Sequence, residues 1–283
     1  MSGKTKIEWA TDVWNPVRGC TKVSSGCTNC YACRMAARFS KACGFPHNGN
    51  IPEPFHGFAE MSPLGPRWTG RVELIESQLK IPLRWRKPRR IFVNSMSDSF
   101  HEALPDDTIR LIFSVMERCR QHTFLVLTKR AERMRNLLGR SDWWAGTIKG
   151  FRSHVWLGVS VEDRASLHRI DSLRETPAAL RFLSLEPLLE DLGELDLRGI
   201  SLCIVGGESG PGARPMNPAW ARSVRKQCFG SGVNFFMKQM GSFWAREQNR
   251  DPDRWEQVDS KGSDPSDWEP DLRVRETPGV SLG

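Results

Sequence analysis

The chain has 283 residues, of which 39% are hydrophobic and 26% charged, and its formal net charge is +8. A chain of this length and apolar content can bury one large core within a single domain. The first ten residues lack the apolar segment of a secretory signal, and no run approaches the about eighteen apolar residues of a membrane span. These features argue against a secreted or membrane-spanning protein, and we expect a cytoplasmic protein without membrane contact.

Four of the eight cysteines lie within fourteen residues near the N-terminus, at Cys20, Cys27, Cys30 and Cys33. Structural disulfides are rare in a reducing compartment, so cysteines at this density indicate metal ligation. Thiolates bind both zinc and iron–sulfur clusters. The residues leave two interpretations open: a compact zinc site that uses all four thiols, and an iron–sulfur cluster held by three of them.

Residues 44–70 are rich in proline and glycine, and we expect a long irregular segment there. A strongly basic run follows at residues 84–90. Together with the net charge, this run indicates a polyanionic partner, although a surface turn before a strand would have a similar composition.

Six short apolar segments in the rest of the chain predict buried parallel strands. They span residues 90–94, 123–127, 155–159, 180–185, 202–205 and 233–237. Segments with helical spacing lie between them, for example residues 106–120 and 131–138. This alternation predicts an α/β fold with mainly parallel strands, arranged as a partial or full (β/α) barrel, with an open doubly wound sheet as the alternative.

Polar residues follow each of the six predicted strands. Any one of them could belong to an ordinary polar turn, but in a parallel barrel all the carboxyl ends of the strands face the site where active centres are built. Six such endings in succession favour a shared site. The candidates on its substrate side are Glu186, Glu208, Lys238 and Gln239.

The chain becomes polar near its end and contains several Asp-Pro and Glu-Pro steps. We expect a barrel domain over residues 1–243, which includes the cysteine segment, and a polar C-terminal extension over residues 244–283.

The cysteines form the pattern GCx6CxxCYA over residues 19–32, and further short blocks follow in order at residues 94–98, 127–130, 156–162, 184–188, 206–210 and 236–239. In this order the blocks resemble a phage-borne and bacterial family of radical-SAM-like proteins of unassigned function. The resemblance covers most of the first 241 residues.

The resemblance implies a barrel of the radical-SAM type in which Cys20, Cys27 and Cys30 hold a [4Fe-4S] cluster that binds S-adenosylmethionine. Reductive cleavage would yield methionine and a 5′-deoxyadenosyl radical. By the same resemblance, the S-adenosylmethionine-binding residues are Met96, Ser97, Asp98, Lys129, Ser160 and Glu162. Cys33 lies outside the three-cysteine pattern.

The expected function is therefore a radical S-adenosylmethionine enzyme that receives electrons from a donor protein. The basic charge favours a nucleic acid or nucleotide as its substrate. Two other functions remain as alternatives: a non-catalytic nucleic-acid-binding protein with a structural zinc site, and an iron–sulfur redox protein.

Overall fold

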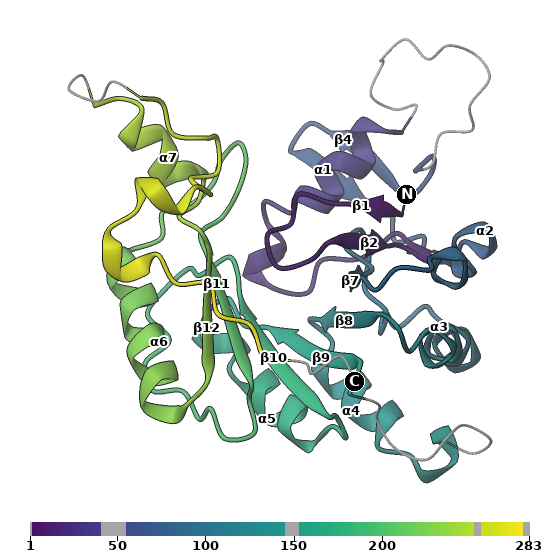
Figure 1. The fold of residues 1–283 in the computed structure, drawn as a ribbon. Helices are drawn as coiled ribbons and strands as arrows, with labels where there is room; N and C mark the ends of the chain where they lie inside the picture. Colours follow the sequence, from purple (N-terminus) through teal and green to yellow (C-terminus); the bar gives the residue numbers. More distant parts are fainter. Residues whose placement is uncertain (1, 41–54, 145–152, 252–255, 280–283) are drawn as a thin grey trace. The chain divides into compact units, whose positions relative to one another are not determined.

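A computed structural model describes residues 2–40, 55–144, 153–251 and 256–279 of the chain (Figure 1). The protein has a mixed α/β fold with one large, mostly parallel sheet of eight strands in the order β1-β2-β7-β8-β9-β10-β11-β12. The chain divides into two compact units. Unit 1 comprises Met1–Val23, Cys30–Trp156 and Pro177–Ala179, and unit 2 comprises Ser24–Asn29, Leu157–Thr176 and Leu180–Gly283.

Unit 1 contains the first four strands of this sheet. They are β1 (Gly3–Lys4), β2 (Asp12–Trp14), β7 (Arg90–Val93) and β8 (Thr123–Thr128). The strand β1 is antiparallel to β2, whereas β2, β7 and β8 are parallel. The helices of this unit are α1 (Tyr31–Arg38), α2 (Glu76–Leu79), α3 (Asp106–Arg118) and α4 (Ala131–Leu138).

Two small antiparallel pairs accompany the sheet in unit 1. They are β3 (Val17–Arg18) with β6 (Glu73–Leu74), and β4 (Ala59–Ser62) with β5 (Gly65–Trp68). The second pair corrects the expectation of an irregular segment over residues 44–70, whose first eleven residues lie outside the described part of the chain. Its turn is closed by the Ser62 hydroxyl, which donates to the Gly65 carbonyl, and Gly65 has a φ of 103° that glycine tolerates.

Unit 2 contains the other end of the sheet. Its strands are β9 (Val155–Ser160), which begins in unit 1, and β10 (Leu180–Leu185), β11 (Leu202–Gly206) and β12 (Asn234–Gln239). The helices are α5 (His168–Glu175), α6 (Pro218–Ser231) and α7 (Ser242–Gln248). The strands β10, β11 and β12 are parallel.

The predicted strands are confirmed to within one or two residues at each end, because their apolar residues are buried on both faces. All residues of β9 and β11 are buried. Packing is tight enough that a Cβ at Gly158 would lie 2.5 Å from the ring of Phe182. Glycine at this position therefore leaves room for the Phe182 ring against the backbone of β9.

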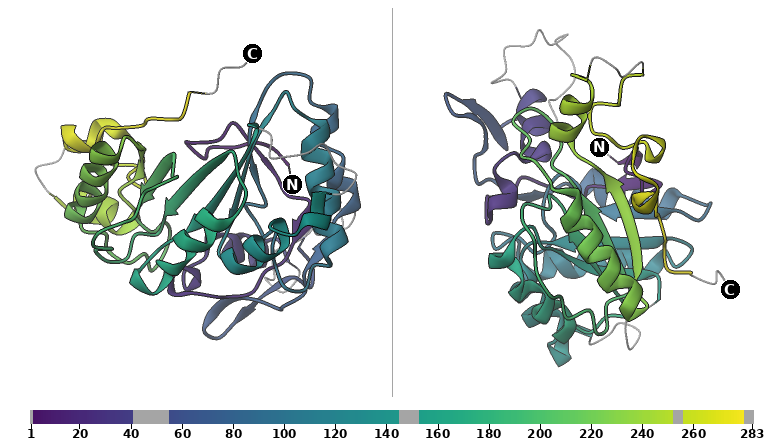
Figure 2. Two further views of the ribbon diagram at one scale, coloured as in Figure 1. Left: turned by 90° about the horizontal axis from the view of Figure 1, so that it is seen from below. Right: turned by 90° about the vertical axis from the view of Figure 1, so that its left-hand side faces the viewer.

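The polar C-terminal segment belongs to unit 2 and packs along its strand β12. After α7 the chain returns along β12, where the Met237 N–H donates to the Val274 carbonyl at 2.8 Å and the Glu276 N–H donates to the Phe235 carbonyl at 2.9 Å (Figure 2). Trp268 and Leu272 are buried. Among the helices of the described residues, none has the length and apolar character needed to cross a membrane.

Candidate functional site

Three of the four clustered cysteines differ from the fourth in their surroundings. Cys20, Cys27 and Cys30 are half-buried, and none of them forms a disulfide. Cys33 lies on the buried side of α1, where burial, reinforced by the neighbouring Cys30, raises the pKa of its thiol to about 12. Because a thiolate is the ligand form, Cys33 is the least suited of the four to bind a metal. Cys20 and Cys30 belong to unit 1, and Cys27 belongs to unit 2.

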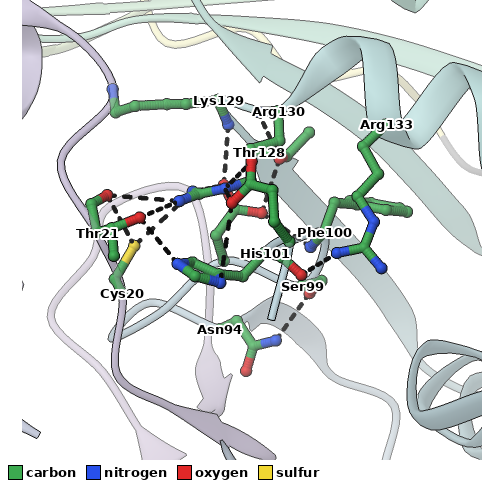
Figure 3. Close-up of polar contacts among 12 residues, drawn as sticks. Cys20, Thr21, Asn94, Ser99, Phe100, His101, Thr128, Lys129, Arg130 and Arg133 are labelled. Atoms are coloured by element: carbon green, nitrogen blue, oxygen red, sulfur yellow. Dashed lines mark hydrogen bonds and ion pairs between the residues drawn. The ribbon is translucent and has the colours of Figure 1, made fainter. Parts of the chain in front are cut away.

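In unit 1, Arg130 organises the surroundings of Cys20 (Figure 3). Its Nη1 lies 3.9 Å from the Cys20 sulfur and 3.1 Å from Asp98 Oδ2, and its Nη2 donates to the Thr21 hydroxyl at 2.8 Å. Burial opposes its charge, but the attraction of Asp98, Cys20 and Glu102 outweighs this effect and raises the pKa of the guanidinium above its usual value. A fixed positive charge therefore lies beside the first cysteine.

Asp98, which follows β7, is buried and accepts four hydrogen bonds. Its Oδ1 accepts from the Phe100 N–H at 2.9 Å and the Thr128 hydroxyl at 2.7 Å, and its Oδ2 accepts from the Lys129 N–H and from Arg130 at 3.1 Å each. The carboxylate thus ties the ends of β7 and β8 together and orients Arg130. These contacts give Asp98 a structural task in addition to the cofactor role expected from the sequence.

The neighbours of Asp98 hold the N-terminal segment of unit 1. The Ser97 hydroxyl donates to the Val17 carbonyl at 3.1 Å, and the Met96 N–H donates to the Asn15 side chain at 3.2 Å. Just before Cys20, Gly19 has a φ of 86°, and a Cβ there would lie 1.9 Å from the Arg71 carbonyl oxygen. The chain can therefore enter the cysteine segment along this path only with glycine at position 19.

In unit 2, the loop of residues 24–29, which we call the Cys27 loop, contacts Glu162 at the end of β9. Glu162 is fully buried, and its Oε2 pairs with Arg169 Nη1 at 2.9 Å while its Oε1 accepts from the Ser24 hydroxyl at 3.3 Å. The Ser160 carbonyl also accepts from Arg169, at 2.8 Å.

The same loop contacts Glu208, which follows β11. Glu208 Oε2 accepts from the Asn29 side chain at 2.9 Å and from the N–H of Arg214 at 2.9 Å. Burial alone would raise the pKa of Glu208, but the hydrogen bonds from Arg214 and Asn29 hold this pKa below its usual value. The carboxylate is therefore ionised at neutral pH and paired on two sides.

The remaining substrate-side candidates lie together at the ends of β10 and β12. The Lys238 ammonium pairs with Glu186 Oε1, and both side chains are mostly buried. Gln239 donates to the Gly207 carbonyl at 2.8 Å, and a Cβ at Gly206 would contact both Gln239 and Glu186. Glu186, Lys238 and Gln239 thus form one polar cluster within unit 2.

The basic partners of these carboxylates were not selected from the sequence. Arg130 directly follows Lys129, and Arg214 lies six residues after Glu208. Only their closeness in the sequence to predicted site residues could have indicated these two arginines. Arg169 lies on α5, seven residues beyond Glu162, and the sequence showed nothing that set it apart from other charged residues of a helix. Pairing of each carboxylate with a particular arginine depends on how the chain folds back.

The chemistry of the three accessible thiols fits a thiolate-held metal group. Cys20, Cys27 and Cys30 are half-buried, lie within eleven residues of one another and include one sulfur beside a buried arginine. Across the described ranges, no group of three or more His, Cys, Asp or Glu side chains is placed to hold a metal ion. The donor set is therefore chemically suitable for such a group.

Comparison with known proteins identifies a family. The sequence model of a protein of unknown function, DUF5131, matches residues 4–266, so the chain belongs to this family. No curated protein and no solved structure matches the chain.

Proposed function

We propose that this member of the DUF5131 family is a radical S-adenosylmethionine enzyme that holds a [4Fe-4S] cluster through Cys20, Cys27 and Cys30. The observation that carries the proposal is the contrast among the clustered cysteines, since three are accessible and the fourth has a pKa raised by burial. When bound, the cluster would supply the electron that cleaves S-adenosylmethionine to methionine and a 5′-deoxyadenosyl radical.

The proposed fold is a partial or full (β/α) barrel of the radical-SAM type. Six strands, β7 to β12, lie in the sheet in the same order as in the chain, which supports successive β/α units. Met96, Ser97, Lys129 and Ser160 are the proposed contacts to S-adenosylmethionine. Asp98 and Glu162 would act mainly by holding the loops that carry these contacts and the cysteines.

Glu186, Lys238 and Gln239 are the proposed substrate-side residues. Unlike Glu162 and Glu208, the Glu186–Lys238 pair shows no described hydrogen bond to the Cys27 loop. The pair offers both an acceptor and a donor to a polar substrate, such as a nucleobase edge. This cluster could therefore orient a substrate without disturbing the cysteine segment.

The proposed nucleic acid or nucleotide substrate rests on the net charge rather than on the basic run. Arg84, Arg86 and Lys87 are exposed, but they precede β7 and so lie at its amino end, whereas Met96 to Asp98 follow its carboxyl end. A long polyanion could contact both ends of the strand, but a single nucleotide could not span from one to the other. An electron-donor protein completes the proposed set of partners.

The test is anaerobic reconstitution with iron and sulfide, followed by measurement of iron content and of 5′-deoxyadenosine formed from S-adenosylmethionine with a strong reductant. Cys27→Ala should lose both the cluster and the product. Cys33→Ala, at the buried position, should retain both and is the matched control. Stoichiometric zinc in protein purified without oxygen, or a Cys27→Ala variant that keeps its cluster, would contradict the proposal.

A further inference from the structure

We infer that Glu162 and Glu208 are positioning residues that hold the Cys27 loop in place before any metal binds. The inference deepens the proposed function, because it concerns how a proposed cluster ligand is presented. It also differs from the sequence-based expectation, which assigned Glu162 to the cofactor and Glu208 to the substrate.

The first argument is that the loop is fixed at both of its ends by the ends of two strands. Ser24 donates to Glu162, which lies 138 residues away in the chain, and Asn29 donates to Glu208, which lies 179 residues away. Between them, the Ser25 hydroxyl donates to Asp163. Cys27 therefore lies in a six-residue loop whose first and last side chains are both anchored in unit 2.

The second argument is the way in which each glutamate is used. Glu162 and Glu208 are almost completely buried, and each binds an arginine as well as a loop side chain. A buried carboxylate needs such a cation to remain ionised, and an ionised carboxylate is a strong hydrogen-bond acceptor. Arg169 and Arg214 thus keep the two acceptors charged for the Cys27 loop.

The third argument is steric. A Cβ at Gly26 would lie 2.5 Å from Glu162 Cγ, so the loop backbone packs directly on this side chain. Arg214 adds a contact from the other side, since its Nη2 donates to the Ser25 carbonyl at 3.1 Å. The loop is therefore held by close packing as well as by hydrogen bonds, in a short 3-10 turn over Ser25–Cys27.

Glu186 provides an internal comparison. It also follows a strand of unit 2 and pairs with a cation, Lys238, but its described contacts do not include the loop. If strand-end glutamates only stabilised unit 2 in general, Glu186 would affect the loop as much as the other two do.

The experiment is hydrogen–deuterium exchange of the metal-free, full-length protein, read at the amides of the Cys27 loop. The double variant Ser24→Ala with Asn29→Ala removes the two donors and leaves both buried ion pairs intact. Because each donor binds a charged acceptor, exchange at Cys27 and Thr28 should become roughly tenfold faster or more. Glu186→Gln is the control and should leave exchange of the loop unchanged.

Three results would overturn the inference: unchanged exchange in the double variant, faster exchange spread throughout unit 2, or an equal effect of Glu186→Gln. Iron content distinguishes this failure from failure of the proposed function. Faster loop exchange together with a Cys27→Ala variant that keeps its cluster would refute the proposed function and retain the positioning role. Unchanged exchange together with cysteine-dependent iron binding would do the reverse.

Discussion

Replacement of Arg130 by methionine should destabilise the protein by about 3 kcal/mol, because it removes the cation from a buried ion pair. The side chain of Arg130 is 4% exposed and that of Asp98 is 7% exposed, so Asp98 would remain buried without its charged partner. Loss of one member of such a pair costs about 3–5 kcal/mol. We expect the lower end, since Asp98 keeps its bonds from Phe100, Thr128 and Lys129.

The ion pair of Arg130 with Glu102 adds little to this value. Glu102 is 64% exposed, and exposed ion pairs contribute about 1 kcal/mol or less. The matched control is Arg140→Met, which breaks pairs with Asp106 and Asp142 whose side chains are 45% and 58% exposed. It should cost less than about 1 kcal/mol.

The assay is urea unfolding of metal-free protein followed by far-ultraviolet circular dichroism. Both variants are compared with the wild type at neutral pH, with the slope of the transition checked for each. A loss below about 1 kcal/mol for Arg130→Met, or equal losses for the two variants, would refute the assignment of Arg130 and Asp98 as a buried, mutually dependent pair.

Three further outcomes are expected. Gly26→Ala should lower the free energy of unfolding by about 1–3 kcal/mol and reduce the iron content, because the added Cβ would overlap Glu162. The control is Gly230→Ala in α6, where a Cβ meets nothing within 4 Å, and this variant should be neutral or stabilising in thermal unfolding. The pKa of Glu208 is lowered in the folded state, so the stability that its ionised form contributes is complete above the ordinary pKa of 4.5 and is lost as the pH falls through the lowered value. The difference in unfolding free energy between wild type and Glu208→Gln should therefore shrink from pH 7 to pH 3. A constant difference would contradict the ion-pair assignment. Trp268→Ala should cost about 3–5 kcal/mol in urea unfolding because Trp268 is 2% exposed, and a near-zero loss would show that the C-terminal segment does not stabilise unit 2.

The polar residues at the strand ends are largely paired with one another. Glu162, Glu186 and Glu208 each bind a different cation, so their negative charges are compensated within unit 2. Each of these carboxylates therefore has a cationic partner of its own at the ends of neighbouring strands. For the proposed enzyme, this pairing also means that selectivity for a substrate would come from hydrogen-bond geometry rather than from a net charge at these positions.

The repeated β/α pattern can be predicted from the sequence alone. Each of the six predicted strands is an apolar run buried on both faces, and such runs are recognisable without knowledge of their partners. The helices α3 and α4 were likewise predicted from the spacing of their apolar residues. The sequence also identified the cysteine cluster, because four thiols in fourteen residues are unusual in any fold.

Short or polar elements depended on tertiary structure. The strand β2 has three residues, one of which is the buried Asp12, and the hairpin of β4 and β5 lacks a clear alternation of apolar and polar residues. The C-terminal segment is polar in composition, yet Trp268 and Leu272 of this segment are buried within unit 2. Local composition does not reveal such packing, since a few buried residues suffice to anchor a polar segment.

The contacts of the strand-end carboxylates also depend on tertiary structure. The sequence indicated that Asp98, Glu162 and Glu208 follow strands. Folding brings each of them to its own arginine, respectively Arg130, Arg169 and Arg214. It also brings Thr21 to Arg130, Ser24 to Glu162 and Asn29 to Glu208. A carboxylate can bind a ligand or hold a loop, and both uses require the same residue type at the same position. The choice between them depends on which donors reach its oxygen atoms, and that is a property of the folded chain.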